Sequence, residues 1–332
     1  MKEGKLDNEV LERSVLSKIK TETPDILLGP GVGEDCGAIR FGEEACVVTT
    51  DPITGATKGS GRLAVHVSCN DLASSGAEPT AVTVTILAPI HATLEDIEAL
   101  MEEISEAAEE IGVAVIGGHT EVTSAVTRMV LSVTALGRVP VDELISTAGA
   151  RAGDWIYMSK TAALEGTVII AAEKSEQLEG VLDKKDLEEL AQLQASLSVM
   201  PEGRIGRKAG VSAMHDITEG GVLGALWEVC EASGTGCTIW GSEIRIAAVT
   251  KKLSGIFEFN PLNLIGSGSM LMTILPDKAQ LLEAEAERQG VALRRIGIIE
   301  ADASVRRLIG GDVEIETIGR PDVDPLYRVL GF

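Results

Sequence analysis

The sequence has few aromatic side chains and far fewer basic than acidic ones. Phe, Trp and Tyr make up only 3% of the 332 residues, too few for the stacking surfaces that bind single-stranded nucleic acids. The 51 acidic residues outnumber the 29 basic ones, and the net charge of -22 repels phosphate backbones and anionic membranes. These deficits argue against a nucleic acid or a membrane as a partner.

Long apolar runs and paired cysteines are absent as well. No stretch of about eighteen apolar residues is available to span a membrane, and the segment Met1-Lys2-Glu3-Gly4-Lys5 lacks the apolar region of a signal peptide. The five cysteines form no C-x-x-C pair and are odd in number, which favours neither a zinc knuckle nor a disulfide framework. We therefore expect a cytoplasmic protein whose cysteines are mostly small buried side chains.

Apolar residues are nevertheless plentiful enough for two cores. Hydrophobic residues make up 45% of the chain, and a chain of this length usually divides into about two domains. In the first half, strands and helices interleave in an order that requires mixed strand directions. The prediction is an α/β (α+β) fold with two domains, residues 1–148 and 149–332, of which the first contains a mixed sheet.

Glycine and proline set two expected strand ends. Pro52 should end the strand over residues 45–50, because proline cannot donate a hydrogen bond to the ladder. Gly117-Gly118 should end a buried strand over residues 113–116.

The clearest helix is expected over residues 93–111, with Thr93 as its N-cap and Asp96 three residues later. A second signal is Gly220-Gly221, where a strand beginning at Ala213 should turn into a helix. The other expected elements are helices over 6–20, 163–198 and 276–289, and strands over 81–87, 129–136, 154–159, 270–275, 293–299 and 312–317.

An apolar helix in the first half, ending in a turn at Gly76, carries a polar stripe. Arg62, His66 and Asn70 recur at steps of four and therefore share one face, with Asp71 alongside. His66 fits a buried structural histidine better than a catalytic one.

Acidic residues also stand at three other loops. Gly33-Glu34-Asp35 closes a glycine-rich loop whose backbone can approach a ligand, Asp51 follows a strand, and Glu121 follows Gly117-Gly118-His119-Thr120. Taken singly, each acid could merely cap a helix or shape a turn. Together with Asp71 they offer the hard oxygen ligands with which Mg²⁺ binds and bridges phosphates. We predict that these four loops converge on one magnesium–nucleotide site.

Two further histidines are candidate functional residues. His119 stands between Gly118 and Thr120, where it either contacts phosphate or substrate or belongs to a turn. His215 precedes Asp216 and suggests a base with an orienting acid, although neighbouring residues on a strand point to opposite faces.

Five motifs resemble, in order, those of the aminoimidazole-ribonucleotide synthetase (PurM-like) superfamily. They are Gly33-Glu34-Asp35-Cys36-Gly37-Ala38-Ile39, Thr49-Thr50-Asp51, Asn70-Asp71-Leu72-Ala73, Gly117-Gly118-His119-Thr120 and His215-Asp216-Ile217-Thr218-Glu219-Gly220-Gly221. The resemblance implies an N-terminal domain that dimerises, a C-terminal α/β domain, and a Mg²⁺–ATP site near the domain and dimer interfaces. It also implies phosphorylation of an oxygen, such as that of an amide or carboxylate, on a small-molecule acceptor.

The resemblance assigns roles to individual residues. The implied metal ligands are Glu34 or Asp35, Asp51 and Asp71, with Glu121 as a substitute for the acid that the family usually has where His119 stands. The residues implied at the cofactor are Gly33, Asn70, Gly117, Gly118, Thr120, Gly220 and Gly221. The candidate catalytic residues are His119 and Asp216, and Asp216 would border the nucleotide or substrate from the second domain.

Within that superfamily, the segments 216–221 and 260–270 are most similar to the hydrogenase maturation (HypE-like) branch, which implies a protein partner in metallocentre maturation. Members of that branch carry a carbamoyl group on a terminal cysteine, whereas no cysteine follows Cys237 here. Two alternatives therefore stay open. One is a small-molecule kinase of the thiamine-monophosphate type, and the other is a nucleotide-binding scaffold without catalysis.

Overall fold

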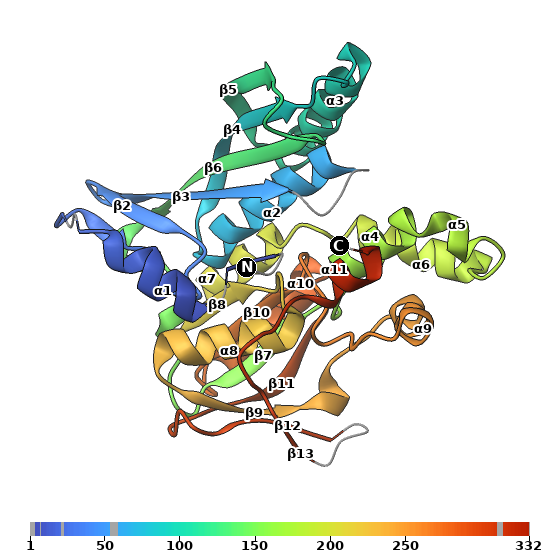
Figure 1. The fold of residues 1–332 in the computed structure, drawn as a ribbon. Coiled ribbons are helices and arrows are strands. Elements are labelled where there is room, and N and C mark those ends of the chain that lie inside the picture. The colour runs from blue at the N-terminus through green and yellow to red at the C-terminus, as the bar shows by residue number, and fades with distance from the viewer. Residues whose placement is uncertain (1–3, 7, 21–22, 54–58, 311–314, 332) are drawn as a thin grey trace.

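A computed structural model describes residues 4–6, 8–20, 23–53, 59–310 and 315–331. These residues form two β-sheets with helices packed against each, one above the other in Figure 1. The six-stranded sheet comes from the first half of the chain and the seven-stranded sheet from the second half. The predicted two-domain α/β architecture is confirmed, and the boundary between residues 148 and 149 stays a prediction.

The first sheet has mixed strand directions, as the sequence predicts. Its strand order is β1-β2-β3-β6-β4-β5, and β4 and β5 are its parallel pair. The strands are β1 (Ile26–Leu28), β2 (Gly37–Phe41), β3 (Glu44–Ile53), β4 (Glu78–Ala88), β5 (Ala114–Val122) and β6 (Val130–Pro140). Helices α2 (Ser60–Ser74) and α3 (Leu94–Ile111) pack on one face.

Helix α2 lies at the centre of the molecule, between the two sheets (Figure 1). Its residues Val65, Cys69 and Leu72 share one apolar core with Val47 and Val133 of the first sheet. The helix can therefore present its polar stripe to the second half of the chain while its apolar residues hold it to the first sheet.

The helix predicted over residues 93–111 is confirmed as α3. Thr93 Oγ1 accepts a hydrogen bond from Asp96 N (3.2 Å), and Asp96 Oδ2 accepts one from Thr93 N (2.8 Å). This reciprocal capping satisfies two backbone donors at the helix start.

The helix predicted over residues 6–20 is shorter in the structure. It consists of α1 (Asn8–Ser14) and one 3₁₀ turn at Leu16–Lys18, and no residue of α1 is buried. The apolar spacing of this segment thus does not build a core.

Pro52 does not end its strand, contrary to the prediction. β3 continues to Ile53, and Pro52 lies opposite Ser132 of β6. β2 pairs with β3 only as far as Val48. Beyond that point no described strand lies along the other edge of β3, so the missing N–H of proline is tolerated.

Gly117 and Gly118 do not end their strand either. β5 passes through both, and Gly118 lies opposite Val84 of β4. A Cβ at Gly118 would lie only 1.9 Å from Val84 O, so glycine permits a close approach of the two strands. The expectation of a buried strand is also wrong, because every residue of β5 is exposed at this edge of the sheet.

The second sheet has the order β13-β12-β9-β11-β7-β10-β8. The strands are β7 (Trp155–Ser159), β8 (Ala213–Asp216), β9 (Gly236–Trp240), β10 (Met270–Ile274), β11 (Leu293–Glu300), β12 (Arg306–Ile309) and β13 (Ile315–Thr317). The strands expected over 154–159, 270–275 and 293–299 are confirmed, whereas β9 and β12 were not predicted. Residues 312–314 of the last expected strand lie outside the described residues.

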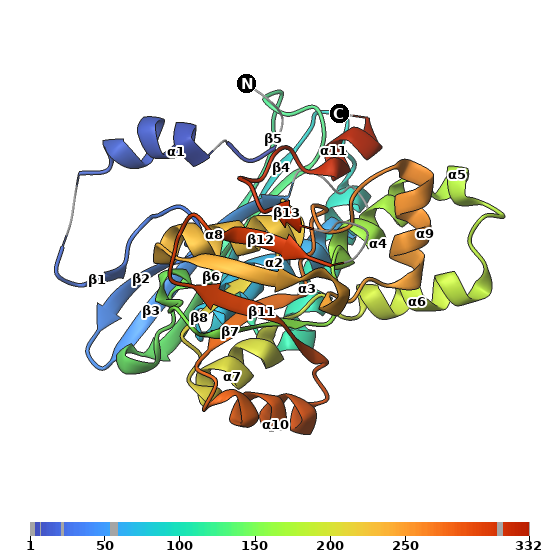
Figure 2. The same cartoon turned by 90° about the horizontal axis from the view of Figure 1, so that it is seen from below.

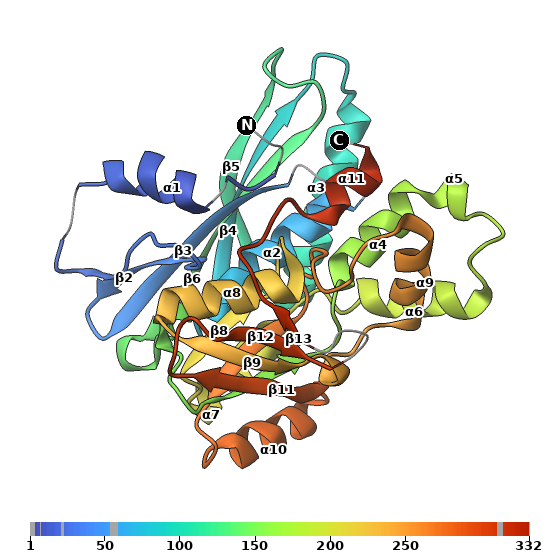
Figure 3. The same ribbon diagram turned by 60° about the horizontal axis from the view of Figure 1, so that its bottom comes forward.

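Helices lie on both faces of the second sheet. Helix α8 (Gly221–Ser233) packs on one face, and α7 (Met200–Ala209) and α10 (Ala279–Gln289) pack on the other, as Figure 2 shows. Beside the sheet lies a separate group (Figure 3) formed by α4 (Leu164–Glu173), α5 (Ser175–Leu178), α6 (Lys184–Gln194), α9 (Ala248–Phe257) and α11 (Pro325–Leu330). Within the described ranges, no helix has both the length and the apolar character needed to cross a membrane.

Candidate active site

Three of the four predicted acidic loops meet the segment before α8 around one cavity. The cavity has a volume of about 540 Å³. Its lining includes Glu34, Asp35, Asp51 and Asp71 from the first half of the chain and Glu165, Thr218 and Glu219 from the second.

Asp71 lies at the end of α2 and is only 5% exposed. Thr49 Oγ1 donates a hydrogen bond to Asp71 Oδ2 (2.7 Å) and also lies 3.4 Å from Asp51 Oδ2. Burial raises the pKa of Asp71 well above its usual value, and the charges of Asp51, Asp216 and Asp35 raise it further. The three loops therefore concentrate negative charge that a cation would relieve.

Asp216 ends β8 and brings a carboxylate from the second half of the chain. One ligand atom each of Asp35, His215 and Asp216 lie within 4.8 Å of one another. Asp216 is completely buried, and neither of its carboxylate oxygens has a hydrogen-bond partner among the described residues. Burial, followed by the charge of Asp35, raises the pKa of Asp216 to about 8.

His215 is bracketed by two carboxylates, neither of which is Asp216. Its Nδ1 lies 3.3 Å from Asp35 Oδ2, and its Nε2 lies 3.1 Å from Glu228 Oε2. Burial acts to lower the pKa of His215, but Asp35 and Glu228 outweigh it and raise the pKa to about 10. The ring therefore carries a positive charge at neutral pH and holds Asp35 at the cluster.

Glu34 and Asp35 have different surroundings. Glu34 Oε1 accepts hydrogen bonds from Ser146 Oγ and from Ala148 N (3.3 Å), at the start of the 3₁₀ helix Thr147–Gly149. Asp35 instead faces His215. The sequence left open whether Glu34 or Asp35 belongs to the site. In the structure Glu34 caps the 3₁₀ helix, whereas Asp35 joins the carboxylate cluster.

Asn70 lies at the contact between the two halves of the chain. Its Nδ2 donates to Leu197 O (2.8 Å), and its Oδ1 accepts from Val199 N (2.8 Å). The side chain is fully buried, so its amide is used to fix the segment that leads into α7.

His66, one turn before Asn70 on α2, is 2% exposed. Burial and then the charge of Arg62 lower the pKa of His66 to about 4. The ring is therefore neutral at physiological pH.

The three candidate glycines near the cavity have positive φ angles, which favour glycine. A Cβ at Gly33 (φ 78°) would lie 3.1 Å from Glu228 Cβ, and one at Gly221 (φ 65°) would lie 2.5 Å from Leu262 O. Gly220 (φ 88°) uses its N–H to donate to Asp324 Oδ2 (2.9 Å). Gly220 and Gly221 thus allow close packing at the start of α8, and Gly33 allows its loop to pack against the middle of that helix.

The fourth predicted loop does not reach the cluster within one chain. Gly117, Gly118, His119, Thr120 and Glu121 lie on β5, and the strands β6 and β4 separate β5 from β3, which carries Asp51. The side chains of His119 and Glu121 are 64% and 47% exposed and lie 3.0 Å apart. This loop was expected to converge with the others in space, but within one chain the strand order keeps it apart from them.

Sequence reasoning missed three charged residues near the cluster. They are Glu165 in the first turn of α4, Glu228 on α8, and Lys5 in the N-terminal segment. Glu165 and Glu228 could have been noticed as single acids within apolar helical segments, whereas nothing local marks Lys5. Burial raises the pKa of Glu165 to about 7.

Comparisons with known proteins agree with this architecture. Residues 33–139 match the family model of the AIR synthase related protein N-terminal domain, and residues 151–309 match that of the C-terminal domain. A putative hydrogenase expression/formation protein of Methanocaldococcus jannaschii is 28% identical over 83% of this chain and 82% of its own length. The carbamoyl dehydratase HypE of Escherichia coli is 24% identical over 88% of this chain and 84% of its own length.

Solved structures share the fold. The crystal structure of Escherichia coli HypE has a TM-score of 0.74 at 22% identity, covering 86% of this chain and 88% of that chain. A HypE structure in complex with ATP has a TM-score of 0.72 at 18% identity, covering 97% and 94%. A ThiL structure complexed with AMPPCP and TMP has a TM-score of 0.68 at 17% identity, covering 86% and 90%.

Proposed function

The chain belongs to the AIR synthase related proteins, and we propose that it uses ATP and Mg²⁺ to phosphorylate an oxygen atom of a small-molecule acceptor. It does so as a homodimer in the cytoplasm. The observation that carries the proposal is the convergence of Asp35, Asp51 and Asp71 at the cavity, with the buried Asp216 next to Asp35.

The donor atoms of the cluster fit a hard divalent cation. Both carboxylate oxygens of Asp216 are buried without a hydrogen-bond partner among the described residues. Buried carboxylates of this kind are normally paired or bound to a metal. Asp35, Asp51, Asp71 and Asp216 would hold Mg²⁺, which supplies neutralisation of the phosphate charge when it is bound.

The protein's own contribution is to position these groups. Thr49 orients Asp71, His215 holds Asp35, and Asn70 ties α2 to the second half of the chain. Phosphoryl transfer depends chiefly on positioning and electrostatic stabilisation, so this arrangement needs no covalent nucleophile.

The exposed strand β5 supports the homodimer. β5 is the last strand of its sheet, its apolar residues Ile116 and Val122 are 63% and 60% exposed, and an uncovered sheet edge favours pairing with another chain. In the dimer, the loop of His119 and Glu121 would serve the cavity of the second copy.

A second candidate, a small-molecule kinase that phosphorylates a hydroxyl group, is favoured by Glu165. This buried carboxyl lines the cavity, and its pKa of about 7 suits a general base at neutral pH. The activation of an amide or carboxylate oxygen consumes the phosphorylated species, whereas the kinase leaves it as a stable product.

The experiment is ³¹P NMR of wild type, Asp71→Asn and Asp277→Asn with Mg²⁺, ATP and a panel of acceptor metabolites. Asp277 is an exposed residue outside the cavity lining and provides the matched control. We expect turnover by wild type and Asp277→Asn, and a loss of about 100-fold or more in Asp71→Asn. Equal turnover by all three proteins would refute the assignment, and no turnover with any acceptor would favour the non-catalytic scaffold.

A further inference from the structure

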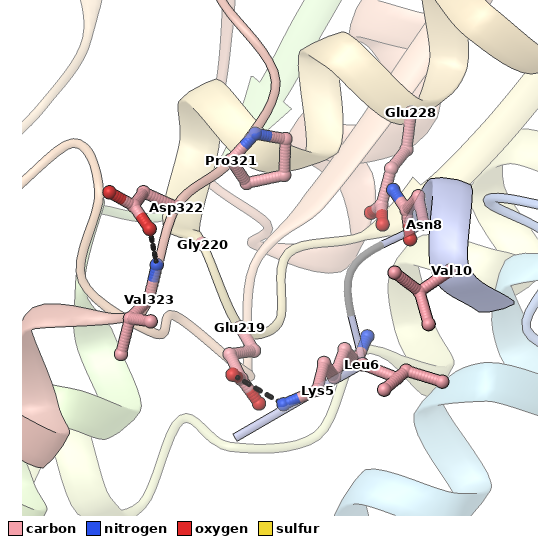
Figure 4. A pocket seen from close by; sticks show the side chains of 10 residues that line it. All are labelled: Lys5, Leu6, Asn8, Val10, Glu219, Gly220, Glu228, Pro321, Asp322 and Val323. Carbon is pink, nitrogen blue, oxygen red and sulfur yellow. Dashed lines mark hydrogen bonds between the residues drawn. The ribbon is translucent and has the colours of Figure 1, made fainter. Parts of the chain in front are cut away.

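A separate cavity of about 790 Å³ lies on the second sheet, and we call it the sheet pocket. Its lining includes Tyr157, Trp240, Leu293, Arg295 and Ile309. None of its described lining residues lines the 540 Å³ cavity of the carboxylate cluster, or the cavity of about 320 Å³ beside the N-terminal segment (Figure 4). A ligand of the sheet pocket is therefore distinct from the nucleotide and the acceptor of the carboxylate cluster.

Four neighbouring strands bring lining residues of the sheet pocket into one row. Arg295 on β11 lies opposite Tyr157 on β7, and Ile309 on β12 lies opposite Trp240 on β9. The strand order β12-β9-β11-β7 places these four residues side by side across the sheet.

This row lies on the face of the sheet on which α10 packs. The residues next to it along three of the strands are buried on the opposite face, in the core with α8; they are Ile239, Ile296 and Leu308. Since successive residues of a strand point to opposite faces, Trp240, Arg295 and Ile309 point to the side of α10. Among the described residues, the core under α7 and α10 includes residues of β7, β8 and β10 but none of β9 or β12. The pocket thus lies where this core leaves the sheet uncovered.

The guanidinium group of Arg295 is held between two tryptophan rings. Its Cζ lies 4.1 Å from the centroid of the Trp155 ring and 5.1 Å from that of the Trp240 ring, and both distances are typical of cation–π contacts. The sequence has only three tryptophans, so two of them surround this one arginine. Stacking occupies the faces of the planar guanidinium and leaves the N–H groups in its plane for hydrogen-bond acceptors.

The described residues supply no such acceptor, because none of them forms a hydrogen bond or an ion pair with the Arg295 guanidinium. The two carboxylates that line the pocket have other partners. Arg294 Nη1 lies 3.0 Å from Glu243 Oε2, and Tyr157 OH donates a hydrogen bond to Glu283 Oε1 (2.5 Å). The charge of Arg295 is therefore available to a ligand.

The third tryptophan provides a comparison within the same chain. The Cζ atoms of Arg306 and Arg320 lie 5.5 and 5.3 Å from the centroid of the Trp227 ring. Both arginines also pair with a carboxylate, Arg306 with Glu231 (2.9 Å) and Arg320 with Glu9 (3.4 Å). The stacked guanidinium of the sheet pocket differs from both, because the described part of the chain gives it no carboxylate.

We propose that the sheet pocket binds a small aromatic monocarboxylate, with its carboxylate on Arg295 and its ring against Trp240. A carboxylate matches the forked donors of a guanidinium. Trp240 offers a ring face for stacking, and Leu293 and Ile309 add apolar surface beside it. The net charge of -22 repels a polyanion such as a triphosphate at long range, which favours a ligand with a single negative charge.

The test uses the full chain labelled with 5-fluorotryptophan. Because the sequence has three tryptophans, ¹⁹F NMR reports Trp155, Trp227 and Trp240 separately, and each signal is assigned by replacing one tryptophan with phenylalanine. The probes are benzoate, phenylacetate and indole-3-acetate, each compared with its neutral amide. Trp227 serves as the internal control, because it lies on α8 at the opposite face of the sheet.

We expect at least one of these carboxylates to shift the signals of Trp155 and Trp240 with a Kd of about 1 mM or tighter. The signal of Trp227 should stay unchanged, and the corresponding amide should bind about tenfold more weakly or worse. The absence of any shift at about 10 mM of every carboxylate, or equal binding of acid and amide, would overturn the proposal. Both outcomes are decided on the wild-type protein and do not depend on a variant that folds.

Variants then locate the carboxylate on Arg295. Arg295→Gln should weaken the carboxylate by about tenfold or more, and Arg295→Lys, which keeps the charge but not the planar fork, should lose part of the affinity. Arg151→Gln is the matched control, because Arg151 is exposed in the same half of the chain and does not line the pocket. Binding to Arg295→Gln as tight as to wild type would contradict the proposal, because the carboxylate would then lie elsewhere.

Discussion

Replacing Asp216 with asparagine should make the metal-free protein less sensitive to pH. Asp216 is completely buried, and its pKa rises from 3.8 to about 8, mainly because of burial and then because of Asp35. Since the pKa is raised in the folded state, ionised Asp216 opposes folding. Its protonated form removes that penalty, so stability falls as the pH rises from about 4 to 8.

The magnitude follows from the size of the shift. One pKa unit corresponds to about 1.4 kcal/mol, so between about pH 5 and pH 8 wild type should lose roughly 2 to 4 kcal/mol through this group. Asp216→Asn cannot ionise and should not lose it. The unpaired amide of the variant has its own cost, but that cost is the same at both pH values and cancels in the comparison.

The assay is urea denaturation in EDTA at about pH 5 and pH 8, with Asp277→Asn as the control. The difference between the unfolding free energies, Asp216→Asn minus wild type, should increase by at least about 2 kcal/mol from pH 5 to pH 8. A pH-independent difference between the two proteins would refute the reasoning. At pH 8, Mg²⁺ should stabilise wild type more than Asp216→Asn, because only wild type keeps all four carboxylates of the cluster.

Other changes test the framework and the second candidate function. Asn70→Ala leaves Leu197 O and Val199 N without their side-chain partner, and urea denaturation should show a loss of about 2 to 4 kcal/mol; a loss under 1 kcal/mol would contradict the bridging role. Gly203→Ala on α7 places a Cβ 2.5 Å from Ala73 O, whereas Gly255→Ala on α9 meets nothing within 4 Å. We therefore expect the first to destabilise by about 1 to 3 kcal/mol and the second to stabilise by a few tenths to about 1 kcal/mol. If Glu165 is a general base, kcat should rise with pH through about 7 and Glu165→Gln should abolish that rise, and an unchanged profile would exclude this role.

Local signals predict the elements that depend on neighbouring residues. The capping box of Thr93 and Asp96 marks α3, and the Gly220-Gly221 pair marks the passage from β8 to α8. The acids at 35, 51 and 71 could be predicted to meet because each stands near one end of a strand or helix in the first half of the chain. Their convergence with Asp216 came only from the family resemblance.

The missed features depend on contacts between distant segments. Pro52 continues its strand because β2 stops pairing at Val48, and β5 is exposed because of its place at the edge of the strand order. Neither fact is encoded in the residues near those positions. Lys5 likewise reaches the cluster through Glu219, which lies 214 positions away in the chain.

The most direct measurement is calorimetric titration of ATP in the presence and absence of Mg²⁺ into wild type, Asp71→Asn and Asp277→Asn. If the carboxylate cluster holds the metal that binds the phosphates, wild type and Asp277→Asn will bind ATP only with Mg²⁺, and Asp71→Asn will lose about tenfold or more in affinity. Unchanged Mg²⁺-dependent binding in Asp71→Asn, or equal binding without Mg²⁺ in wild type, would contradict a metal–nucleotide site at this cluster.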